Sequence, residues 1–290
     1  MNKKILKITA AILVAVIVIL SGVTIWGNNS VDTELITVET DKLSSKWNGY
    51  KIAHISDYHN TPNKNINKDL LDSLKNNKPD VIFITGDIID CHRTDVSRSL
   101  EFINKIKEIA PIYYVTGNHE CNFSINDQKA FDDMIADMVD SGVNVLRNSS
   151  GKIYKGEEFI TIHGINDPYF HCEYSYEVES TTNDLCTELK VEDGFNILLA
   201  HHPEQPLVYA RYGFDLVYSG HAHGGQVRLF GIGAIAPDQG LFPEYTNGLY
   251  KFDDTTLIVS RGIGNSLFPV RVFDRPHLIF TQIKTTHFTD

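Results

Sequence analysis

Two histidines separated by one residue, His221 and His223, lie among glycines in the stretch from Ser219 to Gln226. The apolar run 214–218 directly before them predicts a buried strand, so the histidines fall where that strand opens into a loop. Neutral imidazole nitrogens are good ligands for transition metals, and such a pair can offer two of them to one ion or to two adjacent ions. Histidines at a strand end are also often only hydrogen-bonded to backbone, so the pair indicates a metal site only if the chain supplies further ligands.

Four other predicted strands end in side chains that can bind metals. These strands cover residues 51–56, 81–85, 112–116 and 196–200, and their ends carry Asp57 with His59, Asp87, Asn118 with His119, and His201. Ligands gather at the carboxyl ends of strands in layered α/β folds, so we expect these oxygen and imidazole donors to meet. Mixed imidazole and carboxylate donors suit Mn²⁺, Fe or Zn²⁺ rather than Ca²⁺.

The segments between these strands set the expected fold class. Apolar spacing predicts helices at 68–76, 96–109, 127–140, 182–189 and 207–212. Further β segments are expected at 34–39, 143–146, 152–154, 159–164, 249–252, 256–260 and 278–283. A β-α-β-α-β opening followed by mixed β structure predicts an α/β protein, a four-layer α/β/β/α sandwich of two mixed sheets with helices outside.

The order of the polar blocks resembles a known family. Asp-X-His, Gly-Asp, Gly-Asn-His-Glu, a histidine after a strand and Gly-His-X-His, spread over residues 50–285, resemble the calcineurin-like binuclear metallophosphoesterases. The Gly-Gly-Gln after the last block and the segments 261–264 and 269–271 are similar to the bacterial membrane-associated phosphodiesterase branch typified by the YkuE and YaeI proteins.

The resemblance implies two divalent metal ions as cofactors and a role for each site residue. Asp57, His59 and His223 would hold one ion, Asn118, His201 and His221 the other, and Asp87 would bridge both. The expected reaction is hydrolysis of a phosphodiester or pyrophosphate bond by in-line attack of a hydroxide that bridges the ions. His119 would be catalytic, stabilising the transition state or protonating the leaving group.

Five further residues in or after these motifs are not assigned a single role. Glu120 either orients an imidazole or is an acid at the start of a helix. His202 stands at the variable position after the ligand histidine, and Tyr58 stands where the family commonly has leucine. Arg261 and Arg271 either reach a substrate phosphate or pair with carboxylates.

The N-terminus predicts a membrane anchor. Three lysines, Lys3, Lys4 and Lys7, precede an apolar run from Ile8 to Trp26 that would span roughly 28 Å as a helix. We expect residues 1–30 to be a cytoplasmic stub and transmembrane signal anchor, 31–48 a tether and first strand, and 49–290 the catalytic domain. The lysines place the catalytic domain on the extracytoplasmic side of the cell membrane. A cleaved signal peptide, and hence a secreted protein, is the alternative.

The net charge of the chain limits its possible partners. Residues 31–290 carry 23 basic and 37 acidic side chains, a net charge of −14, so no nucleic acid is expected as a partner. An external site beside a bilayer makes a lipid-linked or cell-wall phosphate ester the expected substrate. A non-catalytic, metal-stabilised extracellular binding module is the alternative function.

The chain has four cysteines, and the sequence leaves their state open. They are either paired as disulfides or free: Cys91, Cys121, Cys172 and Cys186.

Overall fold

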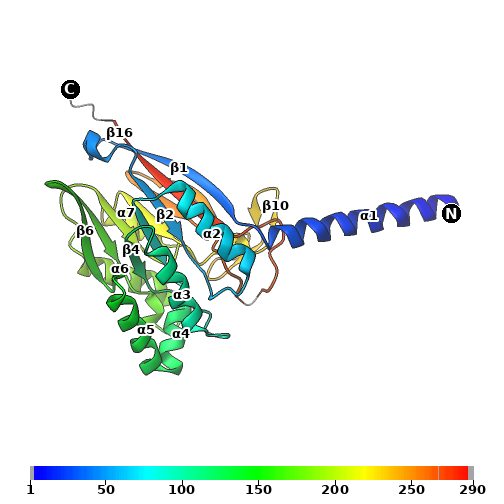
Figure 1. The fold of residues 1–290 in the computed structure, drawn as a ribbon, viewed down its shortest axis with the longest axis horizontal. Coiled ribbons are helices and arrows are strands. Elements are labelled where there is room, and N and C mark those ends of the chain that lie inside the picture. The colour runs from blue at the N-terminus through cyan, green and yellow to red at the C-terminus, as the bar shows by residue number, and fades with distance from the viewer. Residues whose placement is uncertain (1–2, 267, 287–290) are drawn as a thin grey trace.

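Two six-stranded sheets packed face to face form the body of the protein (Figure 1). The computed structural model describes residues 3–266 and 268–286. The first sheet has the order β1-β16-β2-β3-β4-β5, and its strands are β1 Asp32–Thr40, β16 His277–Thr285, β2 Lys51–Ile55, β3 Val81–Thr85, β4 Ile112–Val115 and β5 Asn144–Val145. Strand β16 is antiparallel to β2, and the other pairings in this sheet are parallel.

The second sheet has a parallel centre and antiparallel edges. Its order is β14-β15-β9-β8-β7-β6, with β14 Gly248–Phe252, β15 Thr255–Val259, β9 Leu216–Ser219, β8 Asn196–Leu199, β7 Glu158–Gly164 and β6 Ser149–Lys155. Strands β15, β9, β8 and β7 run parallel, while β14 and β6 are antiparallel to their neighbours. Both sheets are therefore mixed, as predicted.

Helices cover the outer faces of both sheets. On the first sheet lie α2 Lys64–Asn77, α3 Val96–Ile106 and α5 Gln128–Asp140, and on the second α6 Val178–Glu188 and α7 Pro206–Arg211. Successive residues of a strand face opposite sides, so Ile82 and Ile84 pack against the helices while Val81 and Phe83 pack against the other sheet. This double burial explains the continuous apolar run of β3, and the predicted four-layer sandwich is confirmed.

Some element boundaries differ from the predictions. Helix α2 begins at Lys64, not at 68, because the Asn63 side chain caps it by accepting from the backbone N–H groups of Asn65 and Ile66. Helix α4, Asn118–Asn126, was not predicted, because its polar sequence has little apolar periodicity. Two small hairpins were also missed, β10 Arg228–Leu229 with β11 Ile232–Gly233 and β12 Ile235–Ala236 with β13 Gly240–Leu241.

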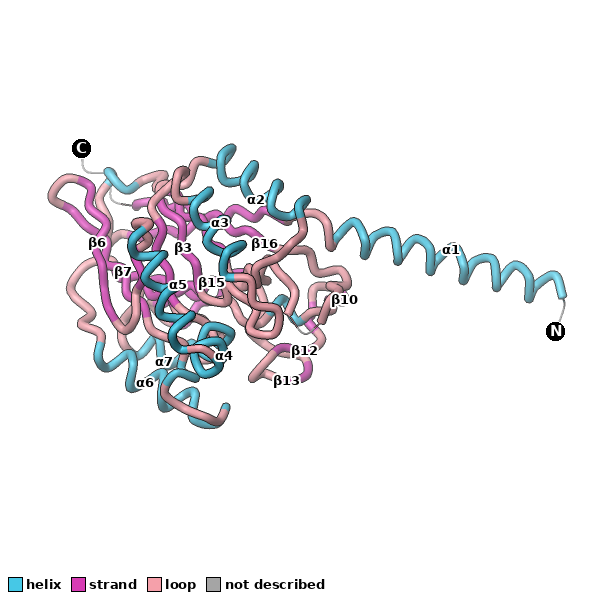
Figure 2. The backbone as a smooth tube through the Cα atoms, turned by 60° about the horizontal axis from the view of Figure 1, so that its bottom comes forward, coloured by secondary structure: helices cyan, strands magenta, loops and turns pink. Residues whose placement is uncertain are grey.

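Helix α1, Lys3–Gly27, projects from one end of the body (Figures 1 and 2). Its segment Lys7–Gly27 is long and apolar enough to cross a membrane, and a signal sequence near the N-terminus can meet the same criteria. The segment after α1 is bonded to the body, because Asn28 exchanges two hydrogen bonds with the backbone of Arg271. The Arg275 guanidinium donates to the Val31 carbonyl oxygen, and β1 follows at once.

Candidate metal centre

The predicted site residues meet at one edge of the paired sheets. They follow β2, β3, β4, β8 and β9, whose carboxyl ends are neighbours within each sheet, and Asn118 and His119 begin helix α4 directly after β4. The two sheets are joined here, because His201 Nδ1 lies 2.7 Å from the Thr85 carbonyl oxygen. The loops approach so closely that a Cβ at Gly220 would collide with Ser56 Oγ and the Asp57 carboxylate. Glycine at position 220 is therefore required to let the last block reach the first.

Five of the seven predicted ligands have left-handed backbone conformations. These residues are Asp57, His59, Asp87, His221 and His223, with φ between 45° and 65°. Such values are uncommon for residues with a Cβ and cost free energy, so they persist only where the surrounding structure enforces them. Their concentration at this edge indicates that the loops are shaped to aim these side chains inward.

One group of donor atoms comes from Asp57, His59 and His223. The two Nε2 atoms of His59 and His223 are 3.1 Å apart, and His223 Nε2 is 3.4 Å from Asp57 Oδ1. His59 Nε2 is 3.7 Å from Asp87 Oδ2. His59 Nδ1 lies 3.2 Å from the Ile89 carbonyl oxygen, which accepts the ring proton and leaves Nε2 with its lone pair facing the group.

A second group forms around His201 Nε2. This atom lies 3.1 Å from Asn118 Oδ1, 3.2 Å from His221 Nδ1 and 3.3 Å from Asp87 Oδ2. Because His201 Nδ1 donates to the Thr85 carbonyl oxygen, Nε2 is the ring nitrogen that faces this group. Asp87 Oδ2 thus lies within 3.7 Å of a histidine Nε2 atom in each group.

The electrostatics of the two groups fit cations. Asp57 and Asp87 are both fully buried, and burial together with the charge of Asp87 raises the pKa of Asp57. Burial lowers the pKa of His59 to about 3, so this ring is neutral and able to bind a metal. Burial also opposes protonation of His201, but the Asp87 carboxylate raises its pKa to about 10. The buried carboxylates thus recruit positive charge, which a divalent ion would supply.

His119 lies beside these groups but its ring has other partners. Its Nδ1 accepts the backbone N–H of Cys91 at 3.0 Å, so the proton of the neutral ring is on Nε2. Nε2 lies 3.2 Å from Ser266 Oγ and 3.9 Å from Asp87 Oδ2. His119 therefore presents an N–H group toward the donor atoms.

Glu120 shapes the loop that carries Asp87. Its buried carboxylate accepts the backbone N–H groups of Gly117, Asp87 and Ile89 at 2.7, 2.8 and 3.2 Å. Burial and the nearby Asp87 raise the pKa of Glu120 to about 7. These contacts match the interpretation as an acid at a helix start, because Glu120 lies in the first turn of α4.

Two residues orient the histidine pair: Asp238, which the sequence analysis missed, and Arg271, whose contact with His223 it did not predict. Asp238, in the turn between β12 and β13, accepts from His221 Nε2 at 2.9 Å and leaves Nδ1 for the second group. Arg271 donates to His223 Nδ1 at 3.0 Å and so fixes the orientation of that ring. Asp238 has no local sequence signal, because only the β12–β13 excursion brings it near His221.

The two arginines singled out from the sequence pair with carboxylates, and Tyr58 packs away from the donor atoms. Arg271 is buried and pairs with Asp274 at 3.3 Å, and Arg261 pairs with Asp32 at 2.7 Å, so the carboxylate-paired interpretation is the one observed. Tyr58 points away from the donor atoms and stacks on Phe102, with ring centroids 4.2 Å apart.

His202 and the cysteines also lie outside the donor groups. His202 is buried, with Nε2 3.0 Å from Asp167 and Nδ1 2.5 Å from Glu204. Within the described residues, each of the four cysteines is free: Cys91, Cys121, Cys172 and Cys186.

A cleft of about 450 Å³ opens onto the two donor groups. Asp87, Asn118 and His119 lie on its polar side, and Ile235 and Phe268 belong to its apolar wall. This combination gives an organic substrate an apolar surface next to atoms that can hold a phosphate.

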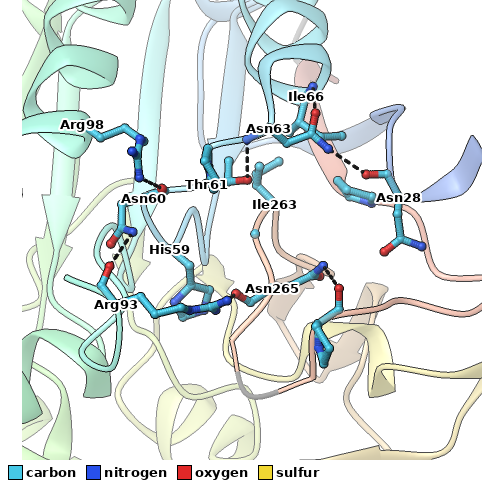
Figure 3. A pocket seen from close by; sticks show the side chains of 14 residues that line it. Asn28, His59, Asn60, Thr61, Asn63, Ile66, Arg93, Arg98, Ile263 and Asn265 are labelled. Carbon is cyan, nitrogen blue, oxygen red and sulfur yellow. Dashed lines mark hydrogen bonds between the residues drawn. The ribbon is translucent and has the colours of Figure 1, made fainter. Parts of the chain in front are cut away.

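A second cavity, of about 460 Å³, is lined in part by His59 (Figure 3). It extends to Asn28 at the root of α1, and Asn63 donates to the Asn28 carbonyl oxygen at 3.1 Å. Arg93 crosses this region and donates to the Asn265 and Ser266 carbonyl oxygens at 2.8 and 3.0 Å. It thereby holds Ser266 beside His119.

Comparison with known proteins assigns the chain to a family. YkuE of Bacillus subtilis, an uncharacterized metallophosphoesterase, is 28% identical over 89% of this chain and 87% of its own length. A zebrafish (Danio rerio) transmembrane protein with a metallophosphoesterase domain is 27% identical over 86% of this chain, which spans 56% of that protein. Among solved structures, the phosphopantetheinyl hydrolase PptH of Mycobacterium tuberculosis aligns with a TM-score of 0.47 and 14% identity, covering 73% of this chain and 89% of that one.

The family model described as calcineurin-like phosphoesterase matches residues 50–225, which include all seven predicted ligands and the catalytic candidate His119. The order of blocks from Asp57 to His223 therefore lies wholly inside the matched region. The predicted family is confirmed, and the chain belongs to the calcineurin-like phosphoesterases.

Proposed function

We propose that this protein is a metal-dependent phosphoesterase with two divalent ions of Mn, Fe or Zn at the strand-end site. Asp57, His59 and His223 would hold one ion, and Asn118, His201 and His221 the other, with Asp87 shared. The observation that supports this proposal most strongly is that two groups of imidazole and carboxylate donors share Asp87 and open onto one cleft. Two ions so held would supply a nucleophile from water at neutral pH and neutralise charge on the phosphoryl group.

The side chains around the ions have separable tasks. The Nε2–H of His119 would donate to an oxygen of the phosphoryl group as negative charge develops there. The Cys91 backbone N–H and Ser266 hold the ring in this orientation. Glu120 keeps the Asp87 loop in place through its backbone hydrogen bonds.

The cleft favours a substrate with organic groups, so we propose a phosphodiester or pyrophosphate rather than a simple monoester. The apolar wall formed by Ile235, Pro237 and Phe268 supports this choice. A monoester or inorganic phosphate would not cover this wall and would leave it exposed to water. Helix α1 supports a single-pass membrane protein with its catalytic domain on the extracytoplasmic side, acting on an envelope phosphate ester.

The test uses the full chain purified in detergent, stripped of metal and reloaded with Mn²⁺. We expect hydrolysis of bis-p-nitrophenyl phosphate by the loaded protein, and a fall to the metal-free background for Asp87→Asn, because both donor groups lose a shared carboxylate. Asp253→Asn, in the exposed turn between β14 and β15, is the control and should remain active.

Two results would contradict this function. Full turnover by the metal-free protein would remove the ions from the reaction. Stoichiometric metal binding without turnover of phosphodiesters, pyrophosphates or monoesters would favour the non-catalytic binding module instead.

A further inference from the structure

Exposed apolar side chains gather on two neighbouring segments near the cleft. We call them the apolar rim: Leu229, Phe230 and Ile232 of the β10–β11 hairpin, and Phe268, Val270 and Phe273 of the loop before β16. Phe230 is fully exposed at the hairpin tip. Its φ of 53° is followed by 84° at Gly231, as tight hairpin turns require, so the turn itself holds this ring away from the body.

The rim lies on the face from which α1 emerges. Val227 forms a parallel bridge with Val272, and Arg228 N–H donates to the Val272 carbonyl oxygen at 2.9 Å. The preceding residue, Arg271, exchanges backbone hydrogen bonds with the Asn28 side chain at 2.7 and 2.9 Å. Residues 271–272 therefore lie between β10 and the root of α1. Figures 1 and 2 both show β10 beside that root and β6 at the opposite end of the body.

The junction between α1 and the body holds the rim at a defined place. The Arg275 guanidinium lies over the Trp26 ring, 4.6 Å from its centroid, and donates to Ser30 Oγ at 3.1 Å. With Asn28 also bonded, the last turn of α1 cannot swing freely on a linker. If α1 spans the bilayer to Gly27, the rim meets the bilayer surface next to the helix.

The rim is also continuous with the cleft. Phe268 belongs to both, because it is exposed on the surface and lines the same cleft as Asn118 and His119. Ile235 at the start of β12 is likewise exposed and lines the cleft. An apolar path thus runs from the surface beside α1 to the two donor groups.

Basic residues on this face are engaged internally. Arg228 donates to the Gly224 and Gly231 carbonyl oxygens, and Arg275 pairs with Asp32 at 3.2 Å. The chain as a whole has a net charge of −11. Contact with a membrane here would therefore be apolar and would not need anionic lipid.

We propose that the apolar rim lies in the same bilayer that α1 spans, and that the substrate is a phosphodiester or pyrophosphate lipid drawn from it. The acyl chains stay in the bilayer and along the apolar wall, while the phosphate reaches the donor groups. This inference rests on the proposed phosphoesterase function and on α1 as a membrane helix. It explains why large apolar side chains are exposed beside the cleft mouth.

Membrane contact is tested without reference to activity. The full chain is reconstituted in phosphatidylcholine vesicles as Phe230→Trp, and its matched control is Tyr154→Trp, an exposed aromatic position on β6 at the far end. Trp26 and Trp47 contribute equally to every sample, so the added emission is read against the unsubstituted chain. Brominated phosphatidylcholine should quench the emission added at 230 and leave that added at 154 unchanged. Emission at 230 that escapes quenching would overturn the docking, including the case in which cross-linking shows a second copy on the rim.

The substrate class is tested with a split between two substrates. The variant Leu229→Ser, Phe230→Ser, Ile232→Ser should hydrolyse soluble bis-p-nitrophenyl phosphate within twofold of the unsubstituted chain. It should lose at least tenfold in turnover of phosphatidyl-p-nitrophenol presented in vesicles, while Tyr154→Ser keeps both activities. Equal lipid turnover by the triple variant would overturn the lipid assignment.

The outcomes separate this inference from the function on which it rests. An Mn²⁺-loaded unsubstituted chain that hydrolyses neither substrate would contradict the phosphoesterase function, yet the quenching result would still decide the docking. If the triple variant misfolds and loses both activities, Phe230→Ser alone, at a fully exposed position, takes its place.

Discussion

At the scale of single residues, the site is defined by which ring nitrogen each histidine presents. Carbonyl oxygens of Ile89 and Thr85 accept from Nδ1 of His59 and His201, so their Nε2 atoms face the donor groups. At His119 the Cys91 backbone N–H reverses this choice and leaves the proton on Nε2. A neutral imidazole of this tautomer is a hydrogen-bond donor, which favours charge stabilisation over protonation of the leaving group as its role.

This choice of role predicts the behaviour of His119→Ala. We expect metal content to be unchanged and kcat to fall roughly 10²- to 10³-fold, because one preorganised donor is lost. The loss should be similar for p-nitrophenyl and for poorer phenyl leaving groups. Steady-state kinetics over a series of aryl diesters, with metal measured by mass spectrometry, checks both points. His171→Ala, at an exposed position, is the control. A loss that grows steeply as the leaving group worsens would instead show that His119 supplies a proton.

At the scale of elements, short excursions from the sheets orient the ligands. The turn between β12 and β13 carries Asp238 to His221, and the loop before β16 carries Arg271 to His223. All five N–H groups of Arg271 have acceptors, which are Asn265 Oδ1, the Arg261 and Gly264 carbonyl oxygens, Asp274 Oδ2 and His223 Nδ1. These outer contacts fix ring orientation, which is how groups behind a ligand tune a metal site.

The Asp238 contact predicts a metal-affinity defect. Asp238→Asn should weaken binding of one ion by roughly 10- to 100-fold, because His221 loses the carboxylate that holds its ring. Titration of the metal-free full chain with Mn²⁺ in a calorimeter measures this directly. Asp253→Asn is a close match, since both aspartates occupy turns with φ of 56° and 50°. Equal affinities in the two variants would show that Asp238 does not position His221.

At the scale of the whole molecule, two sheets meet so that five strand ends share one edge and α1 leaves nearby. One cavity reaches from His59 to Asn28, so the donor groups and the root of the helix are close neighbours (Figure 3). Hydrogen bonds from Asn28 and Arg275 make the helix a fixed extension of the body. This arrangement makes a retained helix, in place of a cleaved one, the expectation.

Retention of α1 predicts the mature form of the protein. Intact mass and N-terminal sequencing of the native protein should show a chain that still contains residues 8–26. The protein should sediment with membranes and resist extraction by alkaline carbonate, because an apolar helix of this length is costly to remove from lipid. A mature chain that begins after residue 20 would identify the segment as a signal peptide and the protein as secreted.

The sequence by itself determined the family, the two-sheet fold and the set of candidate ligands. Its apolar runs marked the buried strands, and each run ended in residues such as Asp57 or His201 that have metal-binding chemistry. Parallel strands bring their carboxyl ends to one edge, so local patterns were enough to predict that these residues meet. Helix α4 escaped prediction because Glu120 and tertiary contacts, not apolar periodicity, support it.

Only the tertiary structure decided which atoms face one another. The pairing of His221 with Asp238 and of His223 with Arg271 joins residues 17 and 48 positions apart, and neither contact follows from a local pattern. The same holds for the apolar rim, because the exposure of Phe230 and its closeness to α1 depend on how residues 271–272 dock between them. The chemistry of each side chain can be read from the local sequence, whereas its orientation and exposure depend on how the whole chain packs.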